Sequence, residues 1–133
     1  MTDVSVTELR LVVTADNYQE ALTFYRDVLG LGQLAEFDSP DGHVVLLDAG
    51  RATLELTDPG NAAYVDQVEV GRRVAGPLRV AFQVADAAAV AERLTAAGAE
   101  LIAPPTGTPG NSRNARLTTP DGVRLTLFDE LGP

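Results

Sequence analysis

The chain has 133 residues, of which 45% are hydrophobic and 22% charged, values that favour one globular domain over a disordered or fibrous chain. It carries 19 acidic and 10 basic side chains, and the resulting formal net charge of −9 disfavours binding to nucleic-acid phosphates. The absence of cysteine excludes disulfides, thiolate nucleophiles and cysteine-ligated metal sites.

The first half of the chain predicts a strand, a helix and three further strands. Residues 9–13 form a short run rich in β-branched side chains, which is typical of a strand. A helix is expected to begin at Asp16-Asn17 and to end at Gly30, where a helix C-terminal cap belongs. Three strands separated by turns follow at 33–37, 43–48 and 52–57.

The second half predicts the same order of elements. A connecting segment, 59–76, is expected to contain a short helix around 62–70. A strand at 80–84 follows, and then a helix that is capped by Asp86 and ended by Gly98. Three more strands are expected at 100–103, 115–119 and 123–128.

The proline- and glycine-rich segment 104–114 is expected to be a long loop. Such a loop is either a lid over a binding site or a solvated connection, and the sequence leaves both interpretations open.

The two halves are related by an internal repeat. Equivalent residues lie 71 positions apart, as in the pairs Val13 and Val84, Leu54 and Leu125, and Asp58 and Asp129. The repeat predicts two βαβββ modules, 7–58 and 77–129, which the segment 59–76 joins within a single domain, 1–133.

Alternation along four of the predicted strands separates an apolar face from a polar face, because successive side chains of a strand point to opposite sides. The polar face carries Glu8, Arg10, Glu55, Arg79, Gln83, Arg124 and Thr126. This face either meets water, as half of an antiparallel sheet often does, or lines a binding site.

The stretch 16–31, which reads DNYQEALTFYRDVLGL and contains Phe24-Tyr25 and Leu29-Gly30, resembles the first-helix signature of the vicinal oxygen chelate superfamily. The turn 120–122 followed by 125–127 matches the same pattern. This superfamily includes glyoxalase I, methylmalonyl-CoA epimerase, extradiol dioxygenases, fosfomycin-modifying enzymes and bleomycin-binding resistance proteins. The resemblance implies an α+β fold in which two tandem βαβββ modules form curved mixed sheets around a cup-shaped cavity, lined by the polar face.

Enzymes of this superfamily usually place a divalent metal in the cup, with ligands from the first and last strands of each module. The resemblance assigns these positions to Glu8, Glu55, Arg79 and Thr126. Arginine has no lone pair to offer a metal, and the one histidine, His43, lies in a predicted hairpin away from these positions. Glu8 and Glu55 alone remain as a weak carboxylate pair for Mg²⁺.

Two interpretations of these four positions stay open. Arg79 either replaces the metal by a fixed cation that holds an anionic or hydrogen-bonding group of a ligand, or closes an internal salt-bridge cluster. We expect a metal-free small-molecule binding protein of the glyoxalase or bleomycin-resistance type, without a cofactor. The alternatives are a divalent-metal-dependent lyase or isomerase resembling glyoxalase I or methylmalonyl-CoA epimerase, with Glu8 and Glu55 as ligands, and an interaction module whose cup is vestigial.

Location and assembly complete the expectations. The N-terminal residues lack the basic and apolar pattern of a secretory signal, and no stretch reaches the length of a membrane span. We expect a cytoplasmic protein without nucleic-acid or membrane partners. The resemblance further implies a homodimer and leaves open whether the modules pair within one chain or between two.

Overall fold

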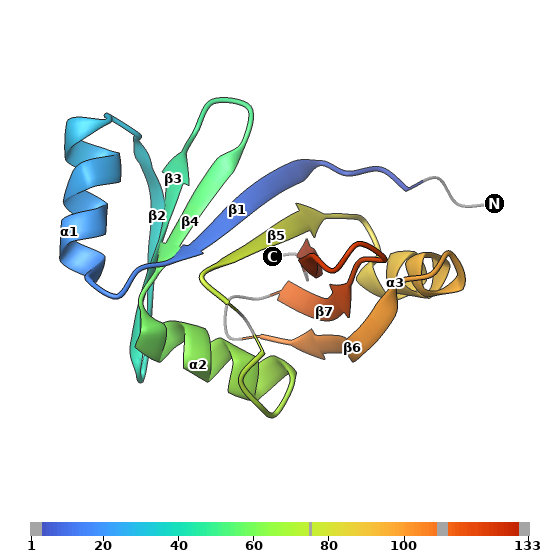
Figure 1. The fold of residues 1–133 in the computed structure, drawn as a ribbon. Coiled ribbons are helices and arrows are strands. Elements are labelled where there is room, and N and C mark those ends of the chain that lie inside the picture. Colours follow the sequence, from blue (N-terminus) through green and yellow to red (C-terminus); the bar gives the residue numbers. More distant parts are fainter. Residues whose placement is uncertain (1–3, 75, 109–111, 131–133) are drawn as a thin grey trace.

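The computed structural model describes residues 4–74, 76–108 and 112–130. Within these segments eight strands form one mixed sheet in the order β2-β3-β4-β1-β5-β8-β7-β6 (Figure 1). The elements in chain order are β1 (Glu8–Thr14), α1 (Tyr18–Leu22), the π-helical η1 (Thr23–Val28), β2 (Gln33–Ser39), β3 (Gly42–Asp48), β4 (Thr53–Thr57), α2 (Pro59–Glu69), β5 (Leu78–Gln83), α3 (Ala87–Ala96), β6 (Glu100–Gly107), β7 (Ser112–Thr118) and β8 (Arg124–Glu130). The predicted α+β fold with a curved mixed sheet is confirmed.

The two halves of the sheet join through β1 and β5. These strands pair antiparallel, with Arg10 opposite Ala81 and Val12 opposite Arg79. On their other sides β1 pairs parallel with β4, and β5 pairs parallel with β8. The halves therefore meet edge to edge within one chain.

The helices α1, α2 and α3 each begin after a side chain that accepts a hydrogen bond from the first turn. Asn17 accepts from the Glu20 amide (3.0 Å), and Asp86 accepts from the Ala89 amide (3.1 Å), where the sequence predicts these starts. Helix α2 begins at Pro59, three residues before its predicted start, because Asp58 caps it and proline suits the first helical turn.

The two larger apolar clusters lie on the sheet face that α1 and α3 cover. Leu22, Val45, Leu47 and Leu56 are buried together beneath α1. The larger cluster beneath α3 consists of Val84, Ala87, Val90, Ala91, Ala115, Leu117, Leu125 and Leu127. Alternate residues of the same strands point to the opposite face, which α1 and α3 do not cover.

Helix α2 crosses that opposite face and contacts both halves of the sheet. It packs on β2 and β3 in the first half and on β6 and β7 in the second (Figure 1). No helix in the described segments is long and apolar enough to cross a membrane.

The prediction that residues 104–114 form a long loop is largely wrong. Strand β6 continues through Gly107 and β7 starts at Ser112, with Thr106 paired to Asn114 across register shifts. Proline is tolerated there because β6 is an edge strand with bulges, where a missing backbone N–H removes little pairing. Of the proposed lid, residues 109–111 lie outside the described residues.

The hairpin between β2 and β3 packs closely against the start of α2. A Cβ atom at Gly42 would overlap Asp58 Oδ1 and the Asn61 amide, whereas one at Gly32 would meet nothing within 4 Å. We predict that Gly42→Ala lowers the free energy of unfolding by about 1–3 kcal/mol, because the cap of α2 must shift. The control Gly32→Ala is expected to change it by less than about 0.5 kcal/mol, and urea denaturation measures both. Equal effects of the two substitutions would contradict this packing.

Candidate functional site

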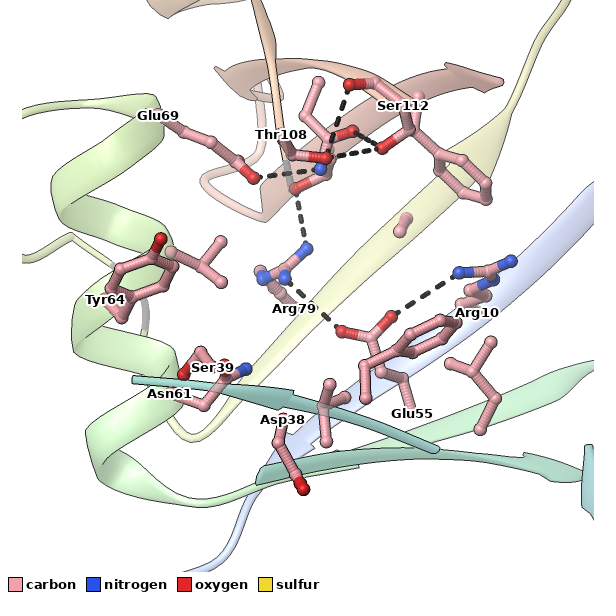
Figure 2. A pocket seen from close by; sticks show the side chains of 18 of the residues that line it. Arg10, Asp38, Ser39, Glu55, Asn61, Tyr64, Glu69, Arg79, Thr108 and Ser112 are labelled. Carbon is pink, nitrogen blue, oxygen red and sulfur yellow. Dashed lines mark hydrogen bonds and ion pairs between the residues drawn. The ribbon is translucent and has the colours of Figure 1, made fainter. Parts of the chain in front are cut away.

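A cavity of about 520 Å³ lies between the two halves of the sheet and beneath α2 (Figure 2). We call it the cup. Its volume is within the range of pockets that hold small organic molecules. The lining comes from both halves and from α2, so the edge-to-edge pairing of β1 with β5 creates the site.

The floor of the cup is formed by four side chains on the four central strands, namely Arg10, Glu55, Arg79 and Thr126. Glu55 lies between the two arginines: its Oε1 is 3.7 Å from Arg10 Nη1, and its Oε2 is 3.7 Å from Arg79 Nη2. Arg79 Nη1 donates to Thr126 Oγ1 (2.8 Å). Figure 2 shows Arg79 pointing into the middle of the cavity and toward Glu55.

Arg10 is held in place by three contacts. Its Nε and Nη2 donate to the two carboxylate oxygens of Glu8 (3.0 and 3.2 Å), and its guanidinium lies 4.5 Å over the ring of Phe128. Thr53 Oγ1 also donates to Glu8. Burial acts to raise the pKa of Glu8, but the hydrogen bonds from Arg10 and Thr53 outweigh it and hold the pKa below its usual value.

Strand register identifies the equivalent positions of the two halves. Paired residues of β1 and β4 differ by 43 in number (Arg10 and Thr53), whereas those of β5 and β8 differ by 45 (Val80 and Leu125). Equivalent residues of β4 and β8 are 71 positions apart in the sequence. Because the two pairings differ by two positions, equivalent residues of β1 and β5 are 69 positions apart. The residue equivalent to Arg79 is therefore Arg10. Glu8, which the sequence analysis assigned to this position, lies two residues earlier on β1 and outside the cup.

Of the seven residues predicted for the site, all within the described segments, the four floor residues line the cup. Glu8 lies behind Arg10, and Gln83 is paired with Glu8 across β1 and β5. Arg124 is exposed and donates to Thr118 Oγ1 (2.7 Å). The sequence pattern predicted these three residues to line the cup; the structure has them on that sheet face but outside the cavity.

The walls of the cup differ in character. The first half contributes the apolar side chains of Phe37, Val44 and Leu46, and α2 adds Tyr64 and Val65. The second half contributes the hydrogen-bonding side chains of Thr108, Ser112 and Asn114. A ligand in the cup therefore meets one apolar wall and one polar wall.

A buried ionic cluster, which the sequence analysis missed, holds α2 to the second half. Arg116, 3% exposed, donates to Asp66 Oδ1 (2.7 Å) and to Glu69 Oε1 (3.1 Å). Asn114 donates to the other oxygen of Glu69 (2.9 Å). The only signal in the sequence was the spacing of Asp66 and Glu69, which places them on one side of a helix.

Glu69 lines the cup from α2. Burial raises the pKa of its carboxyl, and the positive charges of Arg79 and Arg116 with the hydrogen bonds from Arg116 and Asn114 only partly offset this effect.

His43 lies outside the cup, as expected for a hairpin residue. Its Nδ1 is 2.7 Å from Asp38 Oδ1, and its ring lies 5.7 Å from that of Tyr18, on the face covered by α1. The hydrogen bond that the ring of His43 donates to the carboxylate of Asp38 raises the pKa of His43. Figure 2 shows the side chain of Asp38 pointing away from the cavity.

The floor does not fit a divalent metal. The four equivalent positions hold two permanently charged guanidinium groups, one carboxylate and one hydroxyl, and the guanidinium groups repel a dication. In the described segments no group of three or more His, Asp or Glu side chains is arranged to hold a metal ion.

Residues 9–127 match the model of the Glyoxalase/Bleomycin resistance protein/Dioxygenase superfamily. No curated protein matches the chain.

Solved structures with a similar fold include a hypothetical protein from Bacillus halodurans C-125 (TM-score 0.70, 18% identity, 99% of this chain and 98% of that chain covered). Methylmalonyl-CoA epimerase from Mycobacterium tuberculosis aligns with a TM-score of 0.65 at 20% identity, over 96% of this chain and 88% of that chain. A variant of Streptomyces coelicolor methylmalonyl-CoA epimerase in complex with 2-nitronate-propionyl-CoA aligns with a TM-score of 0.70 at 21% identity. The alignment covers 96% of this chain and 100% of that chain. At these identities the similarity shows the fold alone.

The raised pKa of Glu69 predicts a pH-dependent stability. A carboxyl whose pKa is higher in the folded than in the unfolded protein stabilises the fold below its ordinary pKa, and this contribution is lost as the pH rises through the folded value. We predict that Glu69→Gln removes this loss. The unfolding free energy of the variant relative to that of the wild type should increase as the pH rises above about 4.3, the ordinary Glu value.

Urea denaturation at a series of pH values measures this difference. Glu92→Gln, at an exposed position of α3, makes the same change of charge outside the cup and is the matched control. A difference that stays constant with pH for Glu69→Gln would show that the buried carboxyl is ionised as readily as in the unfolded chain.

Proposed function

The chain belongs to the Glyoxalase/Bleomycin resistance protein/Dioxygenase superfamily. From this membership and the lining of the cup, we propose that it is a metal-free small-molecule binding protein of the glyoxalase/bleomycin-resistance type. The observation that carries the proposal is the presence of Arg10 and Arg79 at equivalent first-strand positions on the floor. The ligand is held by enclosure and hydrogen bonding, and the proposal includes no metal or other cofactor.

Electrostatics support this proposal. A guanidinium carries a positive charge and has no lone pair to offer, so neither arginine is suited to be a metal ligand. Glu55, the one carboxylate on the floor, has an arginine 3.7 Å away on each side. A dication beside Glu55 would have to approach both positive groups.

The shape of the cup supports binding as well. Its lining combines apolar side chains, on which the body of a small organic ligand can pack, with many polar and charged groups that can form hydrogen bonds with the ligand. Helix α2 covers the cavity, and its buried ionic cluster with Arg116 makes the cover part of the folded core.

The alternative is a divalent-metal-dependent lyase or isomerase, and the similarity in fold to methylmalonyl-CoA epimerases is the observation that favours it. Its carboxylates would be Glu8 and Glu55. Both carboxylate oxygens of Glu8 accept hydrogen bonds from Arg10, and Glu8 also accepts one from Thr53. Metal binding to Glu8 would therefore require Arg10 to move. The arrangement of charges therefore favours the metal-free proposal.

Location and assembly remain proposals. We place the protein in the cytoplasm and propose that it forms a homodimer. Support for a dimer comes from Leu9, Leu11 and Leu78, which are 39%, 38% and 57% exposed on the central strands. These side chains lie on the face opposite the cup, outside the clusters that α1 and α3 cover.

Binding of an uncharged amphipathic dye tests the proposed function. We predict that Nile red binds the wild-type protein, that its fluorescence rises on transfer to the apolar cavity, and that dialysis against EDTA leaves the affinity unchanged. Val44→Trp, which fills the cup from its apolar wall, should weaken binding by about tenfold or more, equivalent to ~1.4 kcal/mol. Metal analysis of the purified protein should find no stoichiometric divalent ion.

The matched control is Val28→Trp, because Val28 is 73% exposed on η1 and the same side chain is added outside the cup. Binding that is lost after EDTA and restored by Ni²⁺, Zn²⁺ or Mn²⁺ would favour the metal-dependent alternative. Equal binding by Val44→Trp and the wild type would show that the cup is not the binding site.

A further inference from the structure

The charges on the floor of the cup balance one another. Among the described residues, the guanidinium groups of Arg10 and Arg79 face the carboxylates of Glu8 and Glu55. Each arginine is within 4 Å of at least one carboxylate, and Glu55 is shared between the two. Counted together with Glu8, which lies behind Arg10, the floor therefore presents charged groups but no net charge to a ligand.

The cover of the cup is balanced in the same way. Arg116 pairs with Asp66 and Glu69, and Arg73 Nε lies 3.7 Å from Asp66 Oδ2. The rest of the lining adds the exposed carboxylates of Glu36 and Asp38 on β2 and of Glu130 at the end of β8. Neither the floor nor the cover holds an excess of positive charge that would attract an anion into the cup.

Hydrogen-bonding capacity remains on the floor although the charges balance. The two contacts of Glu55 with Arg10 and Arg79 are 3.7 Å long, which exceeds hydrogen-bond distance. In the described part of the chain Arg79 makes one hydrogen bond, to Thr126, and has further N–H groups available. Arg79 and Glu55 therefore offer a donor and an acceptor side by side at the bottom of the cavity.

Resting on the proposed function, we propose that the cup selects a ligand with an uncharged head group that both accepts and donates hydrogen bonds, such as a carboxamide or a lactam. The carbonyl oxygen of the head group accepts from Arg79, and its N–H donates to Glu55. The apolar body of the ligand packs on Phe37, Val44 and Leu46, and its polar edge faces Asn114.

Charged head groups are disfavoured for a physical reason. A carboxylate accepts from Arg79 but is repelled by Glu55, and it brings an unbalanced charge into a partly desolvated, neutral cluster. An amidinium donates to Glu55 but is repelled by Arg79. Only the uncharged head group uses both partners and leaves the balance of charge unchanged.

Three probes of similar shape separate these cases, namely 2-naphthamide, 2-naphthoate and 2-naphthamidine, which are uncharged, negative and positive at neutral pH. Titration of the ¹⁵N-labelled wild-type protein, followed by NMR, measures each affinity and shows whether Arg79 Nε–Hε and the amides of Thr126 and Phe37 respond. We expect 2-naphthamide to bind about tenfold more tightly than either charged probe, the size of effect that an unpaired buried polar group produces.

Two variants shift the balance in opposite directions. Glu55→Gln leaves the floor with a net positive charge, so 2-naphthoate should become the preferred probe. Arg79→Gln leaves a net negative charge, so 2-naphthamidine should become preferred. Either variant tests the proposal if the other fails to fold, and Glu92→Gln changes the protein charge outside the cup and should keep the wild-type order.

The outcomes distinguish this proposal from the proposed function. Tighter wild-type binding of 2-naphthoate or 2-naphthamidine in the cup, or an order of affinities that neither variant changes, would overturn the uncharged-head proposal while binding in the cup stands. If none of the three probes changes the resonances of cup residues in the wild type, the proposed function itself fails.

Discussion

The antiparallel pairing of β1 with β5 is the interaction on which the rest of the structure depends. It joins the two halves edge to edge, brings Arg10 and Arg79 onto neighbouring strands, and aligns their side chains on one face. The opposite face is covered by α1 and α3, whose apolar clusters stabilise each half separately. Because the helices occupy that face, the polar side chains of the central strands are left to line a cavity.

Once the halves are joined, the cup needs a cover, and α2 supplies it through an ionic cluster rather than through apolar packing. Two carboxylates on α2, Asp66 and Glu69, are nearly inaccessible and are matched by Arg116 on β7. Removing one member of such a cluster leaves an unpaired buried charge, which is strongly destabilising. The arrangement therefore fixes the position of α2, and Glu69 couples that position to the electrostatics of the cavity.

The sequence predicted the order of strands and helices because the repeat spacing and the helix caps are local signals, as Asn17 and Asp86 illustrate. It did not predict that the register of β1 with β4 differs by two positions from that of β5 with β8. Two apolar strands with alternating polar residues pair almost equally well when shifted by two positions, so Glu8 and Arg10 were indistinguishable as counterparts of Arg79. The role of Arg116 was also invisible, because its partners are about fifty residues away in a segment that appeared to be a linker.

An arginine at a metal-ligand position changes what the cavity recognises, beyond removing the metal. A divalent ion binds two oxygen atoms of one ligand by direct coordination and tolerates negative charge on both. Arg79 and Glu55 together require an acceptor and a donor, and their charges already cancel. A ligand with two anionic oxygens can coordinate a divalent ion, but the carboxylate of Glu55 repels it. In the proposal made above, the same fold distinguishes chelating anions from uncharged amides through one side chain on each of two strands.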